Sequence, residues 1–126
     1  MIDHTPANRY REMDVAAMSP AQRVVALTGR LHLALRQAKL AVEQGDVERR
    51  ESRLDLASAI LHELAGALDL EQGGEIAERL AALYAWLIGE CLVVHLHPDA
   101  KRLDSPIAVA GELYGAWNEA ARAPMA

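Results

Sequence analysis

The sequence of 126 residues contains no phenylalanine, few other aromatic residues and a single cysteine. One cysteine excludes an internal disulfide bond and is compatible with a reducing compartment. Because aromatic residues are scarce, a core must be built from leucine, alanine, valine and isoleucine, and leucine and alanine favour helices. Apolar residues make up 52% of the chain, which is enough for one domain with a substantial core.

The chain also lacks an excess of positive charge. It has 13 Lys and Arg residues against 18 Asp and Glu residues, which gives a net charge of −5. Nucleic-acid binding depends on clustered Lys and Arg, so we expect no nucleic-acid partner. Residues 1–6 carry no basic segment followed by an apolar one, as a secretory signal would.

The longest apolar stretch, from about Leu80 to Leu96, is interrupted by Gly89 and Glu90. This stretch is too short and too interrupted to span a bilayer. We therefore expect a cytoplasmic protein that does not insert into a membrane.

Apolar periodicity and helix-end signals predict four helices. Ser19 and Pro20 form a typical helix start, and Asp46 can cap the second helix. The predicted helices run from Pro20 to about Glu43, from Val47 to the Gly73-Gly74 pair, from about Glu75 to His97, and from about Asp99 to Ala121. Pro106 predicts a kink or a broken first turn in the last helix.

The connections between these helices are short, which forces neighbouring helices to run antiparallel. The predicted fold is all-α: an antiparallel up-down four-helix bundle of residues 19–122, preceded by an N-terminal arm of residues 1–18. Past Leu80 the third helix is apolar nearly all round, which is typical of a segment buried on several sides. Gly29 is unfavourable inside the first helix.

The sequence offers no convincing catalytic or metal site. His62-Glu63 begins like a zinc-protease helix, but Gly66 stands where the second histidine is needed. His95 and His97 are two residues apart and so point to different faces of a helix. Cys91 lies on the apolar stripe of the third predicted helix, the row of apolar residues that faces the core, and is interpreted as a core residue. We expect no catalysis, no cofactor and no metal.

A second interpretation concerns the segment His62-Glu63-Leu64-Ala65-Gly66, which is similar to the phosphorelay motif of histidine-phosphotransfer domains. Those domains are also four-helix bundles, but they usually place a lysine before the glycine. Here Ala65 occupies that position and cannot offset the charge of a phosphoryl group. A histidine-phosphotransfer signalling domain is therefore kept as the alternative function.

The aromatic residues indicate a surface for a partner. Trp86 lies outside the main apolar stripe of the third predicted helix. It shares a face of that helix with Ala82, Gly89 and Val93. Small and apolar residues on an outer face indicate a groove for another protein, or a surface covered by the arm or by the last helix. Tyr10, isolated in a polar segment, is expected to pack onto the bundle together with Met13 and Val15.

One block of the sequence is specific. The pattern Leu68-Asp69, Gly73-Gly74-Glu75-Ile76-Ala77, Leu80 and Leu83-Tyr84 resembles the central signature of the FliS family of flagellin-specific secretion chaperones. The start around Tyr10, Val15 and Ser19-Pro20 agrees with the family, as do the Gly45-Asp46 turn and the end around Ala116-Trp117. Pro106, Gly111 and Gly115 depart from it, because the last helix of the family is usually unbroken.

The resemblance implies a helical-bundle chaperone without catalytic residues or cofactor. Such a chaperone binds the disordered C-terminal segment of flagellin in the cytoplasm, prevents premature polymerisation and delivers the subunit to the flagellar export apparatus. Other flagellar regulators are further expected partners. The residues expected to bind the partner are Tyr10, Met13, Val15, Ile76, Leu80, Leu83, Tyr84, Trp86 and Val93.

Overall fold

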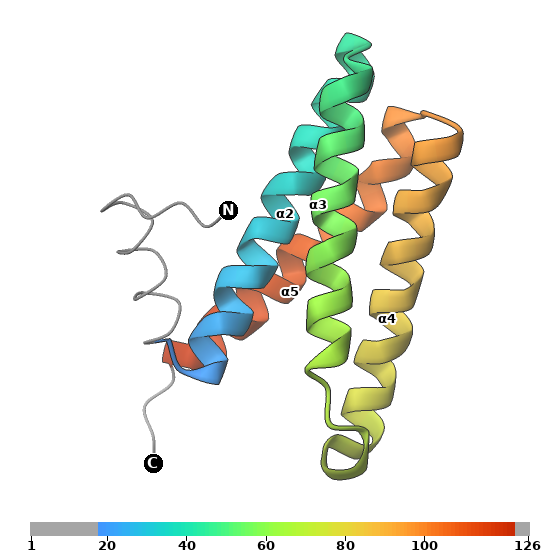
Figure 1. Cartoon of the computed structure of the whole chain (residues 1–126). Helices are drawn as coiled ribbons and strands as arrows, with labels where there is room; N and C mark the ends of the chain where they lie inside the picture. The colour runs from blue at the N-terminus through green and yellow to red at the C-terminus, as the bar shows by residue number, and fades with distance from the viewer. Residues whose placement is uncertain (1–17, 123–126) are drawn as a thin grey trace, which may run out of the picture.

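A computed structural model describes residues 18–122 of the chain, and within them all regular structure is helical. Successive helices run in opposite directions (Figure 1), so the predicted all-α antiparallel four-helix bundle is confirmed. The elements are α2 (Pro20–Gln44), α3 (Val47–Gly66), α4 (Leu70–Leu96), the short 3₁₀ helix η1 (Ala100–Leu103) and α5 (Asp104–Arg122).

The predicted starts of the first two helices are confirmed. The Ser19 hydroxyl accepts a hydrogen bond from the backbone N–H of Gln22 at 3.1 Å, and the Gln22 side chain accepts one from the Ser19 N–H at 2.9 Å. This reciprocal pair is a capping box. Asp46 caps α3 by accepting a bond from the Arg49 N–H at 3.0 Å. Between the two helices, Gly45 ends α2 in the left-handed conformation, with φ 68°.

The predicted boundary between the second and third helices is wrong. α3 ends at Gly66, and a new cap forms at Asp69, whose carboxylate accepts bonds from the backbone N–H groups of Glu71 and Gln72. Helix α4 therefore starts at Leu70, before the glycine pair. Gly74 interrupts its first turns with φ 54° and ψ −133°, a conformation that is almost confined to glycine. The glycine pair thus marks a break, as predicted, but the break lies between the short helical segment that starts at Leu70 and the long helix that follows it, and not at the end of α3.

The last helix begins with the broken turn that Pro106 predicted. Asp99 caps η1 by accepting a bond from the Lys101 N–H at 3.1 Å, and α5 follows from Asp104. Pro106 thus falls in the first turn of α5, where N–H groups have no partner within the helix, so proline is tolerated there. The Pro106 side chain is buried, and α5 continues to Arg122.

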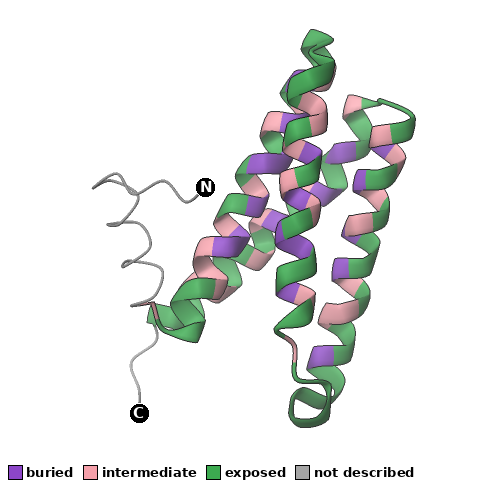
Figure 2. Cartoon of the chain, in the orientation of Figure 1, coloured by how far each residue is buried: buried purple, intermediate pink, exposed green. Residues whose placement is uncertain are grey.

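The core is formed by buried residues of α2, α3 and α4, with Leu103 of η1 and Ala110 of α5, and Figure 2 shows the buried strips on the helices. It is built from leucine and alanine, as the composition predicts, together with one aromatic ring, that of Tyr84. Thr28 is fully buried, and its hydroxyl donates to the carbonyl oxygens of Val24 and Val25. The fully covered apolar members include Leu31, Leu35, Ala38, Ala57, Leu61, Leu87, Val94, Leu103 and Ala110.

The helices are covered unequally. Helix α2 packs against both α3 and α5, whereas α4 packs against α3 and η1 and has little contact with α5. In Figure 1, α4 and α5 separate from one another below η1. Their connection is fixed by Arg102, whose guanidinium donates to the Glu90 carboxylate at 2.9 and 3.3 Å. The prediction that the third helix is buried on several sides is therefore wrong.

Candidate functional site

Helix α4 is the most apolar helix of the described chain and one of its least covered. It is the one helix within residues 18–122 that is long and apolar enough to cross a membrane. Only 22% of its most apolar 18-residue segment is buried. This composition is weak support for a membrane span, because the core helices of soluble proteins share it. What distinguishes α4 is the amount of apolar side chain that it leaves open to solvent.

Five of the sequence-predicted site residues lie along α4 and are at least partly open to solvent. Ile76 is 73% exposed and Trp86 is 40% exposed, while Leu80, Leu83 and Val93 are half-buried. Ile76, Leu80 and Leu83 follow one another at steps of three and four residues, so they share one side of the helix. We call the surface formed by Ile76, Leu80, Leu83, Trp86 and Val93 the first α4 face.

Tyr84 lies elsewhere. Its side chain is 2% exposed and packs in the core, and burial raises the pKa of its hydroxyl. Tyr84 is therefore part of the core and does not belong to the exposed surface. Tyr10, Met13 and Val15 lie outside the described residues.

A hollow of about 490 Å³ lies between the start of α2 and the end of α3. Its lining includes Val24, Leu27 and Leu64 on the apolar side and Arg23 and Glu63 at the rim. Met18, the first described residue, also lines it, so the N-terminal segment joins the bundle directly at this hollow.

The sequence reasoning missed several exposed apolar residues. Leu92 is 57% exposed and Leu96 is 62% exposed on α4, and Leu33 and Leu40 on α2 are 51% and 50% exposed. The signal that could have found Leu92 and Leu96 is the apolar character of α4 on all sides, since a helix that packs against few neighbours cannot cover every side.

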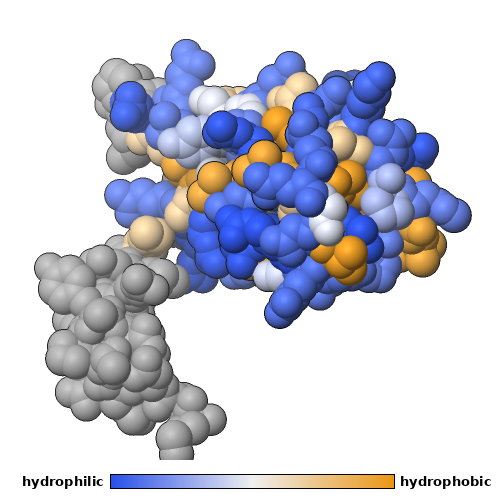
Figure 3. All heavy atoms as spheres, turned by 90° about the horizontal axis from the view of Figure 1, so that it is seen from above, coloured by the Kyte–Doolittle hydropathy of each residue, from blue (hydrophilic) through white to orange (hydrophobic). Residues whose placement is uncertain are grey.

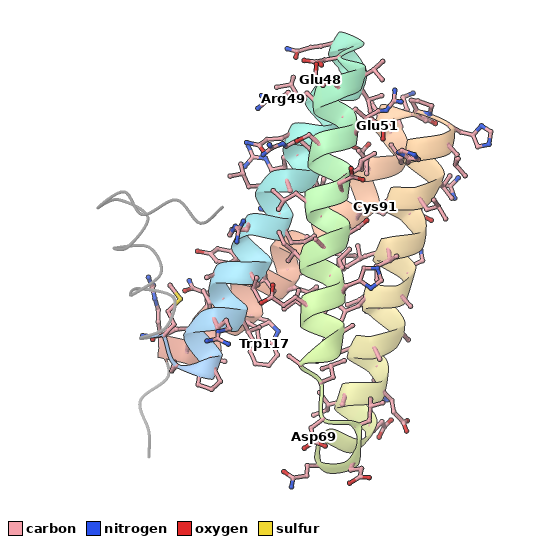
Figure 4. All side chains as sticks on the ribbon, viewed as in Figure 1. Glu48, Arg49, Glu51, Asp69, Cys91 and Trp117 are labelled. Atoms are coloured by element: carbon pink, nitrogen blue, oxygen red, sulfur yellow. The ribbon has the colours of Figure 1, made fainter. Side chains whose placement is uncertain are left out.

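Polar groups near α4 contact one another rather than forming a reactive centre. The His95 imidazole Nδ1 lies 2.5 Å from the Glu51 carboxylate, and Figure 4 shows Glu51 on the side of α3 next to α4. Burial raises the pKa of the Cys91 thiol to about 11, so this thiol stays protonated and weakly nucleophilic near neutral pH. Within residues 18–122, no three His, Cys, Asp or Glu side chains gather as metal ligands would.

The phosphorelay interpretation receives no added support from the geometry. His62 is exposed on α3, and Ala65, which replaces the expected lysine, is half-buried beside the core. Within the described chain, His62 takes part in no salt bridge.

Comparison with known proteins finds one matching family and several relatives. The family described as "Flagellar protein FliS" matches residues 3–124. The "Flagellar secretion chaperone FliS" of Salmonella typhimurium is 34% identical over 109 residues, which cover 86% of this chain and 81% of the relative. The protein of the same name from Campylobacter jejuni is 30% identical over 119 residues, which cover 94% of this chain and 93% of the relative. This chain belongs to the FliS family of flagellar secretion chaperones.

Proposed function

We propose that the protein binds the disordered C-terminal segment of flagellin in the cytoplasm, prevents its premature polymerisation and assists its delivery to the flagellar export apparatus. The observation that carries this proposal is the first α4 face, a set of apolar side chains on a helix that packs against α3 and the short η1 and has little contact with α5. An apolar surface of this kind in a cytoplasmic protein favours association with another protein.

The first α4 face fits a helix better than an extended chain. Ile76, Leu80 and Leu83 recur at helical spacing, so an amphipathic helix can place its own apolar stripe along them. A disordered segment must lose conformational entropy when it forms such a helix, so the free energy of binding must come from apolar contact. In the complex, the flagellin segment would take the place of a second helical neighbour of α4.

The N-terminal segment has a part in this proposal. We propose that Tyr10, Met13 and Val15 pack onto the bundle near the hollow that Met18 lines, and that they either cover the binding surface or contact the substrate. A tyrosine suits both roles, because its ring can be buried while its hydroxyl stays in water. Other flagellar regulators are proposed as further partners.

The test is a calorimetric titration of the protein with flagellin that retains or lacks its C-terminal segment. We expect binding only when the segment is present, with a clearly negative heat-capacity change from apolar burial. Ile76→Glu and Trp86→Glu should each weaken binding at least about tenfold, because a charge enters an apolar contact at high cost. Leu40→Glu is the matched control, since Leu40 is similarly exposed but lies on α2.

Two results would reject the proposal. The first is equal affinity for flagellin with and without the segment. The second is an effect of Leu40→Glu as large as those of the two α4 variants, which would show that the first α4 face has no special role.

A further inference from the structure

The C-terminal part of α4 is joined to η1 by an ion pair between Glu90 and Arg102. The Arg102 Nε donates to the Glu90 Oε2 at 2.9 Å, and the Arg102 Nη2 donates to the Glu90 Oε1 at 3.3 Å. Two parallel bonds between a guanidinium and a carboxylate fix the orientation of the two groups as well as their distance. The Glu90 side chain is 16% exposed and that of Arg102 is 47% exposed, so the carboxylate is largely covered.

Glu90 stands in line with the first α4 face. Ile76, Leu83 and Glu90 follow one another at steps of seven residues, which is close to two full turns of a helix. Figure 3 views the molecule from the end where α4 turns into η1, and most of the visible surface there is hydrophilic, with separate apolar patches. The ion pair therefore lies on the side of α4 that carries the first α4 face, toward this polar end.

Arg102 also belongs to the segment from which α5 starts. The next residue, Leu103, is fully buried in the core, and α5 follows directly from Asp104. The 3₁₀ helix η1 packs against α2, α4 and α5. Two neighbouring residues thus tie the start of α5 to different parts of the molecule, because Leu103 joins it to the core and Arg102 joins it to α4.

The rest of α5 is held along α2 in a single register. Close approaches in this register pair Gly29 with Tyr114, His32 with Gly111, and Lys39 with Asp104. Each step along α2, first of three residues and then of seven, is matched by an equal step backwards along α5. Helix α5 is therefore fixed on α2 at several points along its length.

Helix α4 has fewer ties to this unit. Buried apolar residues join α4 to α3, and apolar attraction has no preferred direction. Among the side-chain ion contacts of residues 18–122, the other one that leads away from α4 joins His95 to Glu51 of α3. The bond between Glu90 and Arg102 is thus the charged contact that relates α4 to η1 and, through η1, to α5.

We propose that Glu90 and Arg102 are a positioning pair, which holds α4 at the separation from α5 that the first α4 face needs to bind the flagellin segment. This inference rests on the proposed function, and it gives the two residues a role that requires no contact with flagellin. Without the pair, α4 takes a range of positions, and fewer molecules have the arrangement that binds. The apparent affinity falls in proportion to that fraction.

A purely stabilising role predicts a different result. An ion pair with a half-exposed partner contributes little to the free energy of unfolding, so its loss should leave the bundle folded. If the pair acted only through stability, flagellin binding would change as little as the unfolding midpoint does. A positioning role predicts a large loss of affinity together with a small change in that midpoint.

The first experiment measures the position of α4 without flagellin. Spin labels are attached at Glu78→Cys on α4 and Glu119→Cys on α5, which are exposed positions, while the native Cys91 is buried. Pulsed electron spin resonance gives the distribution of distances between the two labels. We expect a narrow distribution in the chain with an intact pair and a clearly broader one when Arg102→Gln is added.

The second experiment titrates the full chain with the flagellin C-terminal segment. Arg102→Gln and Glu90→Gln should each weaken binding at least about tenfold, while the urea midpoint stays near that of the unaltered protein. Arg102→Lys keeps the charge but loses the two parallel bonds, so its affinity should be intermediate. The exchange of Glu90→Arg with Arg102→Glu restores an ion pair and should recover both the affinity and the narrow distance distribution.

Lys39→Gln is the matched control. It removes another partly exposed ion pair, between α2 and α5, while the two glycine contacts still hold the register of these helices. This variant should change neither the label distances nor the affinity for the flagellin segment.

An unchanged distance distribution in Arg102→Gln would overturn the proposal, as would a broader distribution without loss of affinity. The same holds if Lys39→Gln weakens binding as much as Arg102→Gln does. Recovery of the distances but not of the affinity in the exchanged pair would show that Arg102 acts by touching flagellin, which also contradicts a positioning role. If the unaltered protein fails to bind flagellin, the proposed function is rejected, and the label distances still decide whether the pair sets the position of α4.

Discussion

The ring of Tyr114 on α5 occupies the space that a side chain at Gly29 on α2 would need. A Cβ atom at Gly29 would lie 3.2 Å from Cε2 of Tyr114. One turn earlier on α5, a Cβ atom at Gly111 would lie 3.2 Å from Nε2 of His32. Two glycines on facing helices thus let α5 lie close along α2, and this position takes α5 away from α4.

The first prediction concerns this contact. Gly29→Leu should destabilise the protein by about 1–3 kcal/mol, because a larger side chain overpacks the contact with Tyr114. Gly89→Ala is the control, since nothing lies within 4 Å of its Cβ position. It should stabilise the protein by roughly 0.5–1 kcal/mol through helix propensity. Urea unfolding of both variants tests the pair, and a gain of stability in Gly29→Leu would disprove close packing.

The second prediction concerns the acid range. Burial, followed by the nearby Arg36 guanidinium, lowers the pKa of His32 below its ordinary value of 6.5. The unfolded chain then binds this proton more readily, so stability should fall as the pH drops from 6.5 toward the folded-state pKa. His32→Gln should flatten this part of the profile, whereas the exposed His62→Gln should not. Denaturant midpoints at several pH values provide the measurement.

The third prediction separates packing from binding on α4. Leu87 is fully buried, so Leu87→Ala should cost roughly 2–5 kcal/mol of stability. Leu83 is half-buried, so Leu83→Ala should cost less than about 2 kcal/mol but should weaken binding of the flagellin segment. Denaturant unfolding and calorimetry give the two quantities. Equal stability losses would place Leu83 in the core.

The fourth prediction concerns the N-terminal segment. Tyr10→Asp should weaken flagellin binding by more than about 1 kcal/mol, because a charge enters an apolar contact at a cost, and should leave unfolding nearly unchanged. Deletion of residues 1–14 distinguishes the two proposed roles: a cover, when removed, should tighten binding, and a substrate contact, when removed, should weaken it. Unchanged affinity in Tyr10→Asp would remove this residue from the site.

Local signals in the sequence predicted the helix ends well. The caps at Ser19, Asp46 and Asp99 depend on a side chain and the backbone two or three residues away, so they can be read without knowledge of the fold. The same is true of Pro106. The end of α3 was misplaced because Gly73-Gly74 is the more obvious break, while the cap at Asp69 that starts α4 is a less evident signal.

The coverage of α4 could not be predicted in this way. A helix that is apolar on all sides is compatible with deep burial or with an open surface, and the difference depends on where α5 lies. That position depends on contacts between residues far apart in the sequence, such as Gly29 with Tyr114. The sequence therefore identified Ile76 and Trp86 as surface candidates but missed the exposed Leu92 and Leu96.

The unequal packing of α2 and α4 also has a consequence for local unfolding. Helix α2 is held by α3 and α5, so its backbone amides should exchange with solvent deuterium only when the whole bundle unfolds. Helix α4 is held by α3 and by the short segment that Glu90 and Arg102 secure, so its amides should exchange through openings of lower free energy. The helix that exposes the most apolar surface is thus also the one that separates from the rest most easily.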